Sequence, residues 1–348
     1  MNIVIISPFQ KIMPRGIERF CYSLANAMGQ MGHQVIIYAW KSKNEFSWGD
    51  LHHNVKIKEC PSFRYYQRAW IANYYNMLLS KDKPDAVLLN FLYHGELQLS
   101  KRWNYTYVLH SPASQIKNRY GFIKNNIKKF KNLKFVAVSN MVKQEAEPFL
   151  EGRQCEVIFN GVDLKLFTPK LKNGHKSKLK IITASALEER KGIQFVIRAI
   201  ANYQNKEKID YQIYGNGSYE KELLTLIRKL ELEDIVTLNS PVTNLNEVLR
   251  EFDLFALLSK GEAFPIAPLE AMASGLPLLV SDYEPYSEFI KSDFGFMLSP
   301  EDKTSIHKVF DLMIDDSLIK NQMNLNSRKA ALEFCWSSVS EKYTKYIN

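Results

Sequence analysis

Two glutamates stand eight positions apart in the stretch GEAFPIAPLEAMASGLPLLVSD, residues 261–282. Between Glu262 and Glu270 the chain places a phenylalanine, two prolines and small apolar residues, which leave little water to solvate a carboxylate. The alternative is that both are solvated loop and helix residues, as most glutamates are. We interpret the pair as two contacts to one sugar-bearing ligand.

An anion site is expected between these two carboxylates. The stretch lies between two strand-like apolar runs, so it is predicted to be a loop that opens into a short helix, with Pro268 in the first turn and Gly275 at the end. The unpaired backbone N–H groups near Ile266 and Ala267 then offer a site for phosphate oxygens. A ligand with phosphates in its middle can present hydroxyls to both glutamates.

A pair of cations precedes another predicted helix. Arg190 and Lys191 follow the strand-like run LKIITASA and are expected to open a helix beside Gly192, where cations are unfavourable to the helix dipole. An anion bound between them removes this conflict. Ordinary surface positions are a fair alternative for each cation alone and a poor one for the pair.

Further candidates carry weaker signals. Gly16 begins the predicted helix GIERFCYSLANAM, where its bare backbone can approach a sugar or a phosphate, although a lone glycine before a helix is weak by itself. His110 ends the predicted strand YTYVLH and is a candidate functional residue. The alternative is a strand-end histidine whose ring only hydrogen-bonds to the backbone. Gly215 and Gly217 lack the third glycine of a dinucleotide fingerprint and are expected to form a tight turn.

The elements that must position these residues alternate between β-branched runs and amphipathic segments. Such alternation predicts parallel strands with crossover helices, and 348 residues suit two domains. We therefore expect an α/β fold with two Rossmann-like doubly wound parallel-sheet domains, residues 1–160 and 161–334, facing across a cleft that holds the active site. The polar segment 165–178 is interpreted as the linker. The tail of about 335–348 is expected to form a final helix anchored by Trp336, for which packing on the N-terminal domain is one option.

Composition favours a folded protein of a reducing compartment. With 46% hydrophobic and 24% charged residues, long disorder is disfavoured. The four cysteines, Cys21, Cys60, Cys155 and Cys335, show no CxxC or metal-like spacing, which suits reduced thiols in a cytosol. We expect no signal peptide and no membrane span, and hence a cytoplasmic protein, soluble or bound at the inner face of a membrane.

The net charge of +9 is concentrated in residues 115–134, which hold seven cations and no acid. Within residues 117–134 an apolar stripe at helical spacing lies among the lysines, which predicts a peripheral contact with an anionic membrane. The compatible alternative is that the stripe packs on the N-terminal sheet and the lysines are only solvated. The aromatic segment 63–75 suits a sugar or a lipid interface, and nucleic acid is disfavoured because no recognised module accompanies the charge. The stripe is Tyr120, Ile123, Ile127 and Phe130.

The glutamate stretch resembles the signature of the retaining glycosyltransferases of family 4, which have the GT-B fold of two facing Rossmann-like domains. Three other segments agree with the resemblance, which covers nearly the whole chain. SPFQKIMPRGIERF resembles the first glycine loop, VIFNGVDLKLFTP the interdomain segment and LEERKGIQFVIRAI the phosphate-binding loop. Departures from the family pattern are Arg15 before Gly16, Ala186 and Ser185 where relatives carry an arginine, and Pro265 in place of a glycine.

The resemblance implies roles for individual residues. Glu270 is expected to bind the ribose hydroxyls, Glu262 and His110 the donor sugar, and Arg190 with Lys191 the diphosphate leaving group, whose negative charge grows as the glycosidic bond breaks. His94 is a weaker candidate on the acceptor side. The other residues implied in nucleotide-sugar binding are Gly16, Val242, Phe264, Ile266 and Ala267.

The resemblance implies a retaining transferase that moves a sugar from a nucleotide diphosphate sugar, with UDP favoured, to a hydroxyl of a glycan or lipid-linked glycan, in cell-surface polysaccharide biosynthesis. No cofactor and no essential metal are expected, because the Asp315–Asp316 pair does not follow a strand. The alternatives are a sugar-nucleotide epimerase or a phosphorylase of the same fold, or a non-catalytic partner that binds nucleotide or membrane.

Overall fold

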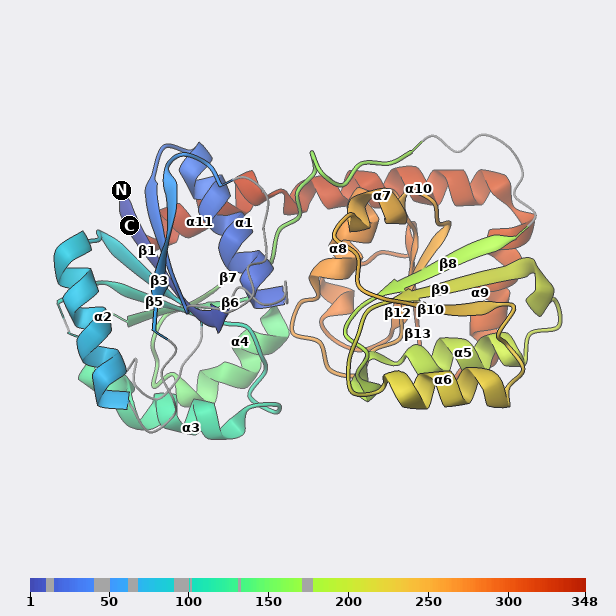
Figure 1. The fold of residues 1–348 in the computed structure, drawn as a ribbon, viewed down its shortest axis with the longest axis horizontal. Helices are drawn as coiled ribbons and strands as arrows, with labels where there is room; N and C mark the ends of the chain where they lie inside the picture. Colours follow the sequence, from blue (N-terminus) through green and yellow to red (C-terminus); the bar gives the residue numbers. More distant parts are fainter. Residues whose placement is uncertain are drawn as a thin grey trace. The chain divides into compact units, whose positions relative to one another are not determined.

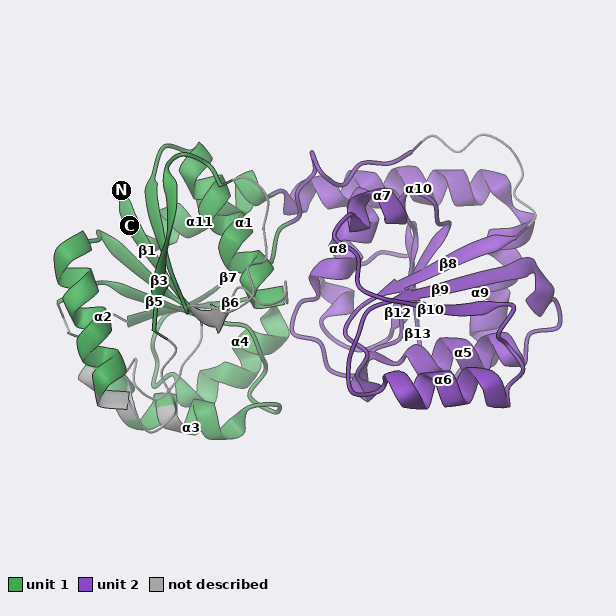
Figure 2. Ribbon diagram, in the orientation of Figure 1, with its two compact units in different colours: residues 1–161, 336–348 green, residues 162–335 purple. Residues whose placement is uncertain are grey.

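The computed structural model describes residues 1–10, 16–40, 51–61, 68–90, 100, 102–130, 133–170 and 178–348. These residues form two compact units, shown in Figure 2. Unit 1 comprises Met1–Gly161 and Trp336–Asn348, and unit 2 comprises Val162–Cys335. Several residues singled out from the sequence lie outside the described ranges, namely Arg15, Phe63, Tyr65, Tyr66, His94, Lys131 and the linker residues 171–177.

Unit 1 contains a parallel sheet in which the described strands follow the order β3-β2-β1-β4-β5-β6-β7 (Figure 1). Described helices connect β1 to β2, β3 to β4, β5 to β6 and β6 to β7, as crossover connections between parallel strands do. The strands are β1 (Asn2–Gln10), β2 (Gln34–Trp40), β3 (Val55–Cys60), β4 (Ala86–Leu89), β5 (Tyr105–Leu109), β6 (Leu133–Ala137) and β7 (Cys155–Val157), and the helices are α1 (Gly16–Gln30), α2 (Arg68–Asp82), α3 (Lys117–Asn126), α4 (Asn140–Ala146) and α11 (Trp336–Ile347).

Unit 2 contains a second parallel sheet, with its described strands in the order β10-β9-β8-β11-β12-β13. The chain leaves β8 toward one side and returns at β11 on the other, so the strand order reverses between these two neighbours. The strands are β8 (Leu179–Ala184), β9 (Ile209–Tyr214), β10 (Val236–Asn239), β11 (Leu254–Leu257), β12 (Leu278–Ser281) and β13 (Gly295–Leu298), and the helices are α5 (Ile193–Ala201), α6 (Glu220–Lys229), α7 (Leu245–Leu249), α8 (Ile266–Ala273), α9 (Lys303–Asp315) and α10 (Ser317–Ala331). The prediction of two doubly wound parallel sheets is confirmed.

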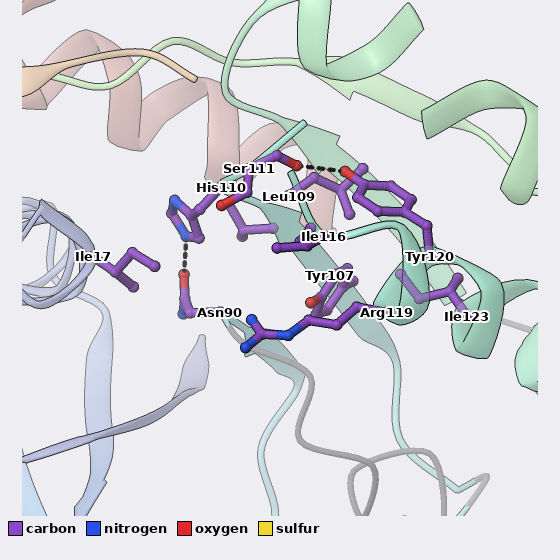
Figure 3. A pocket seen from close by; sticks show the side chains of 11 residues that line it. Ile17, Asn90, Tyr107, Leu109, His110, Ser111, Ile116, Arg119, Tyr120 and Ile123 are labelled. Atoms are coloured by element: carbon purple, nitrogen blue, oxygen red, sulfur yellow. Dashed lines mark hydrogen bonds between the residues drawn. The ribbon is translucent and has the colours of Figure 1, made fainter. Parts of the chain in front are cut away.

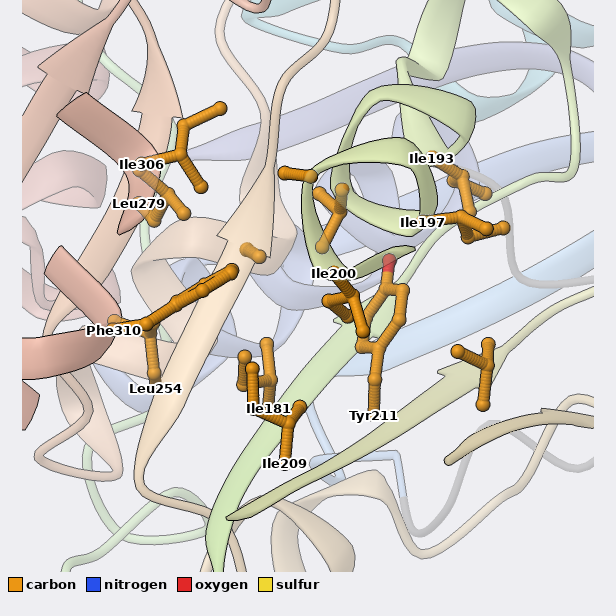
Figure 4. Close-up of a cluster of buried hydrophobic side chains, with 14 of the residues drawn as sticks. Ile181, Ile193, Ile197, Ile200, Ile209, Tyr211, Leu254, Leu279, Ile306 and Phe310 are labelled. Carbon is orange, nitrogen blue, oxygen red and sulfur yellow. The ribbon is translucent and has the colours of Figure 1, made fainter. Parts of the chain in front are cut away.

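The core of unit 2 packs helices α5 and α9 against strands β8, β9, β11 and β12, as Figure 4 shows. Ile197 and Phe310 are fully buried in this cluster. Its one labelled polar group, the hydroxyl of Tyr211, lies 2.7 Å from Thr183 Oγ1, which in turn lies 2.5 Å from the Ala256 carbonyl oxygen. These bonds satisfy buried polar atoms and join β9, β8 and β11, so the ends of the strands are held at fixed spacing.

Helix α11 packs on α1 within unit 1 (Figure 1). The buried ring of Phe20 meets the rings of Trp336 and Tyr343, each at 5.8 Å between centroids. The Trp336 ring lies so close to Gly161 that a Cβ at that glycine would stand 2.6 Å from ring atom Cδ2. The tail therefore completes the hydrophobic core of unit 1.

The basic segment folds largely as the packing alternative describes. Its apolar stripe is buried in unit 1, with exposures of 0–4%. Lys134 donates to the Tyr346 carbonyl oxygen at 2.7 Å near the end of α11, so this ammonium takes part in packing within unit 1. In the described parts of the chain, none of the helices combines the length and apolar character needed to cross a membrane.

Replacing Trp336 with alanine should remove this anchor. We expect Trp336→Ala to lower the free energy of unfolding of unit 1 by about 3–5 kcal/mol, because it leaves a cavity against Phe20 and Gly161. Urea denaturation followed by far-UV circular dichroism measures the change. Leu325→Ala, which truncates a side chain that is 67% exposed on α10, is the control and should cost less than about 0.5 kcal/mol. Equal effects of the two substitutions would contradict the packing role of Trp336.

Candidate functional site

Two loops at the carboxyl ends of the neighbouring strands β8 and β11 carry the main candidate residues. After β8 the chain forms a short 3-10 turn, Glu189–Lys191, followed by Gly192 with φ of 70°, and only then does α5 begin at Ile193. The expectation that Arg190 and Lys191 open a helix was therefore wrong. The left-handed glycine ends the turn, and both cations precede the helix.

Gly192 also brings the two loops into contact. A Cβ at this position would lie 1.8 Å from the Leu258 carbonyl oxygen, so only glycine allows this backbone approach. Next to it, the Lys260 amide donates to the Arg190 carbonyl oxygen at 2.7 Å. The spacing between the two loops is thus fixed by backbone contacts.

The contact of the loops places both cations against Glu262. Lys191 Nζ lies 2.6 Å from Glu262 Oε1, and the two side chains are 13% and 8% exposed. Arg190 Nη1 lies 3.7 Å from the same oxygen, while its Nε lies 2.8 Å from Glu188 Oε2 and its side chain is 45% exposed. Lys191 is therefore the buried partner of Glu262, and Arg190 is a more exposed cation beside it.

Helix α8 begins directly after Glu262 and Phe264. Its N-cap is Pro265, whose ring has no hydrogen-bonding group, so the amides of Ile266 and Ala267 have neither a side-chain cap nor an intrahelical acceptor. Pro268 stands in the first turn, and Gly275, with φ of 76°, follows the last turn, as expected. These amides form the positive end of the helix.

Glu270 and Phe264 take different places around α8. Glu270, one turn into the helix, is 4% exposed. The Phe264 ring is also 4% exposed and packs against Phe289 at 4.7 Å and Phe334 at 6.2 Å between centroids. The expected contact of Phe264 with a ligand can therefore come from its backbone, because its ring belongs to an apolar cluster.

The glycines after β9 have a structural reason that the sequence alone does not reveal. A Cβ on Gly215 would lie 1.9 Å from the Ser185 carbonyl oxygen, and one on Gly217 would lie 2.3 Å from that of Leu187. These close backbone contacts pack the loop after β9 against the loop after β8. Val242, in the loop after β10, is half-buried.

His110 lies in unit 1, in a small hollow of about 20 Å³ shown in Figure 3. Its Nε2 lies 3.0 Å from Asn90 Oδ1, and because an amide oxygen only accepts, Nε2 carries the proton. Burial lowers the pKa of His110 to about 3, so the ring is neutral near pH 7 and Nδ1 is left as an acceptor. The Phe20 ring meets the imidazole edge-on at 4.7 Å.

Asn90 is the functional candidate that the sequence interpretation missed. It is 1% exposed, and its Nδ2 has no hydrogen-bond partner among the described residues. The signal was a polar residue directly after the buried strand AVLL, at the carboxyl edge of the sheet. Asn90 orients His110 through its Oδ1, and its Nδ2 is available to donate to a ligand. Gly16 begins α1, and a Cβ there would meet no described atom within 4 Å.

Arg119 lines the same hollow as His110, so this cation of the basic segment is turned toward the candidate site (Figure 3). Asp315 is the last residue of α9, and the Asp316 side chain accepts from the Ile319 amide at 2.8 Å and caps α10. Within the described residues, no three His, Cys, Asp or Glu side chains group to hold a metal ion.

Comparison with known proteins adds independent findings. Residues 14–166 match the family model described as Glycosyltransferase Family 4, and residues 168–330 match Glycosyl transferases group 1. The amylovoran biosynthesis glycosyltransferase AmsK of Erwinia amylovora is 32% identical over 40% of this chain and 37% of its own length. The N-acetylgalactosamine-N,N'-diacetylbacillosaminyl-diphospho-undecaprenol 4-alpha-N-acetylgalactosaminyltransferase of Campylobacter jejuni is 24% identical over 57% of this chain and 54% of its own length. The chain thus spans about a third to a half of these relatives.

Solved structures share the fold over their whole length. Sucrose-phosphate synthase of Thermosynechococcus elongatus superimposes with a TM-score of 0.84 at 16% identity, covering 99% of this chain and 98% of that one. Anabaena HepE, solved in complex with UDP and glucose, superimposes with a TM-score of 0.80 at 18% identity, covering 100% of this chain and 99% of that one. At these identities the likeness concerns the fold.

The neutral state of His110 predicts a pH dependence of stability. Because burial lowers its folded pKa to about 3, the unfolded chain binds a proton there below about pH 6.5 that the folded chain does not. Stability should therefore fall as the pH falls through this range, and His110→Gln, which cannot titrate, should lose less. The measurement is the urea midpoint at pH 7 and pH 5. His53→Gln, at an exposed position, is the control, and equal losses in wild type and His110→Gln would refute the assignment.

Proposed function

Because this chain belongs to the family 4 glycosyltransferases, we propose that it transfers a sugar from a UDP-sugar to a hydroxyl of a glycan or lipid-linked glycan, with retention of anomeric configuration. The observation that carries the proposal is the convergence of Lys191, Arg190 and Glu262 before the bare amides of α8. A place in cell-surface polysaccharide biosynthesis is supported by the names of the relatives, one of amylovoran biosynthesis and one acting on a diphospho-undecaprenol-linked sugar.

The donor diphosphate is proposed to bind between the two cations and the start of α8. Lys191 and Arg190 supply positive charge, and the amides of Ile266 and Ala267 supply directed donors, which suit phosphate oxygens. As the bond to the sugar breaks, negative charge grows on this diphosphate, so the same groups stabilise the transition state more than the ground state. No essential metal is required when two side-chain cations carry this role.

The nucleoside end of the donor is proposed to bind deeper in unit 2. Glu270, buried one turn into α8, accepts hydrogen bonds from the ribose hydroxyls. Val242 contacts the base from the loop after β10. A uridine donor is supported by HepE, which shares the fold and was solved with UDP.

The transferred sugar is proposed to bind Glu262 of unit 2. Glu262 is held by Lys191 at 2.6 Å, and an ion-paired carboxylate is a weak nucleophile, so a covalent intermediate on it is disfavoured. The acceptor oxygen instead forms its bond to the anomeric carbon on the face that the diphosphate leaves. The acceptor's proton passes to the departing phosphate oxygen, which balances the reaction. In unit 1, Gly16 with its bare backbone and neutral His110, whose Nδ1 can accept a hydrogen bond from a hydroxyl, are proposed sugar contacts.

The other enzymes of this fold and a non-catalytic partner make different predictions. An epimerase turns over its donor without an acceptor, and a phosphorylase releases a sugar phosphate from a glycan. A non-catalytic partner binds nucleotide but shows no turnover, either with Glu262 in place or after its replacement. Donor turnover that depends on an added glycan acceptor separates the transferase from all three.

The experiment compares UDP-glucose, UDP-galactose, UDP-N-acetylglucosamine and GDP-mannose. We expect UDP-sugars to raise the melting temperature and GDP-mannose to leave it unchanged, since a ligand that binds only the folded state stabilises it. With the best donor, Lys191→Ala should lower kcat about 10²–10³-fold and Arg190→Ala less, because Arg190 is more exposed. Lys229→Ala, at an exposed position of α6, is the control. Stabilisation by no nucleotide-sugar, or full activity in Glu262→Ala, would refute the proposal.

Contact with an anionic membrane remains a second part of the proposal. Its support is the set of exposed cations Lys117, Lys124 and Lys128 on and after α3, since the apolar stripe beneath them is buried. Lys128 is 80% exposed, with Glu151 at 3.8 Å. The contact is therefore proposed to be electrostatic, without insertion of apolar side chains.

Replacing these three lysines with glutamine should weaken binding to vesicles that contain phosphatidylglycerol. At roughly 1 kcal/mol for each cation, the partition coefficient should fall about 100-fold. The control replaces Lys208, Lys221 and Lys229, exposed cations of unit 2, with glutamine. Its net charge equals that of the first triple variant. Co-sedimentation measures both, and equal partitioning of the two variants would refute a contact through α3.

A further inference from the structure

A larger hollow lies at the carboxyl edge of the unit 2 sheet. Its volume is about 360 Å³, within the range of about 300–1,000 Å³ for small-molecule sites. Three strands contribute to it at their carboxyl ends, Lys260 following β11, Asp282 and Tyr283 following β12, and Ser299 to Glu301 following β13. In doubly wound sheets this is the edge where ligands bind.

Hydrogen bonds to the backbone hold the walls of this hollow. The Asp282 amide donates to the Leu298 carbonyl oxygen at 3.1 Å, which keeps the chain after β12 beside the chain after β13. Ser281 Oγ donates to the Ser259 carbonyl oxygen at 2.5 Å, which ties the loop after β11 to β12. The wall is therefore part of the folded sheet edge.

Lys260 connects the hollow to the candidate site. Its amide bonds to the Arg190 carbonyl oxygen, and only Gly261 separates it from Glu262. Its Nζ lies 3.4 Å from Glu301 Oε1 and 4.9 Å from the centre of the Phe195 ring. The ammonium is thus turned toward α5 and α9, on the hollow's side of the loop.

The charges of the lining favour a neutral ligand. Asp282 and Glu301 bring two carboxylates and Lys260 one ammonium, so a phosphate would meet net negative charge, and a metal cation would meet the ammonium. Together with the Ser299 hydroxyl, these groups offer both donors and acceptors over a short distance. Vicinal hydroxyls, each a donor and an acceptor, match this set.

The ring of Tyr283 adds an apolar surface. Tyr283 is 48% exposed and is one of the exposed large side chains of unit 2. Its backbone is held in a turn, because the Tyr286 N–H donates a hydrogen bond to the Tyr283 carbonyl oxygen at 3.1 Å. An aromatic face with carboxylates beside it suits a sugar ring, whose C–H face is apolar and whose edge is polar.

We propose that this hollow is a carbohydrate subsite, in which Tyr283 stacks on a neutral sugar ring and Asp282, Glu301 and Lys260 bind its hydroxyls. It is separate from the anion site at α8 and binds a sugar unit of the glycan. Its use during transfer rests on the proposed function, whereas its affinity for a sugar does not.

The test is saturation-transfer-difference NMR on the full chain with UDP present in excess. The probes are methyl α-glucoside, methyl α-galactoside, N-acetylglucosamine and N-acetylgalactosamine. At least one should bind with a Kd in the millimolar range, and Tyr283→Ala should weaken it about tenfold, as loss of one stacked ring implies. Asp282→Asn should weaken the same sugar.

Two control variants test whether the effects are specific to the hollow. Leu325→Ala removes another exposed apolar side chain and Asp293→Asn another exposed acid of unit 2, and neither should change the affinity. An unchanged melting temperature shows that each variant is folded. Failure of all four sugars to bind wild type, or binding that UDP abolishes or Tyr283→Ala leaves intact, overturns the inference. Sugar binding in a chain without transferase activity would refute the proposed function alone.

Discussion

The candidate site of unit 2 depends on one backbone contact, between Gly192 and the Leu258 carbonyl oxygen. A side chain at residue 192 would lie 1.8 Å from that oxygen, so the loops after β8 and β11 can approach only through a glycine. The two strands are neighbours in the sheet. Further along the same loops, the Lys260 N–H donates a hydrogen bond to the Arg190 carbonyl oxygen, which is a second backbone contact between them. The position of Lys191 relative to Glu262 is therefore set by the sheet rather than by flexible side chains.

A buried hydroxyl cluster also supports the same loop. The Tyr286 hydroxyl lies 2.8 Å from Ser259 Oγ, and Ser281 Oγ donates to the Ser259 carbonyl oxygen at 2.5 Å. Burial, and then the nearby charge of Glu262, raise the pKa of Tyr286 well above its usual value, so the phenol stays protonated and keeps this bond. The segment directly before Glu262, residues 258–260, is thus fixed by these contacts, which is the preorganisation that electrostatic catalysis needs.

What the sequence predicts well is what neighbouring residues determine. Alternating apolar runs predict the parallel strands, Pro268 and Gly275 predict the two ends of α8, and Gly16 predicts the start of α1, because each signal is local. Glu262 stood out because a carboxylate among apolar neighbours conflicts with local rules, and such conflicts mark functional sites.

What the sequence does not predict depends on residues far apart in the chain. The 3-10 turn before α5 ends at Gly192, where a side chain would meet the Leu258 carbonyl oxygen, and a side chain at Gly215 would meet the carbonyl oxygen of Ser185. Lys134 looks like a surface cation until the end of α11 is placed beside it, 212 positions later. Asn90 resembles any loop residue until His110, twenty positions on, shares its hydrogen bond. Hydrophobic periodicity carries no information about such pairs.

The burial of the Lys191–Glu262 pair is itself an argument for a charged ligand. Removing two ions from water costs about as much as their attraction returns, so a buried pair contributes little to stability. Two apolar residues of similar volume would serve the fold as well. In the proposed function the pair is useful because Lys191 can bind the diphosphate as a second anion while it still holds Glu262 Oε1, and the other carboxylate oxygen of Glu262 can accept hydrogen bonds from hydroxyls. Lys191 then contacts both the proposed anion site and Glu262, so one ammonium links the anion site to the sugar site.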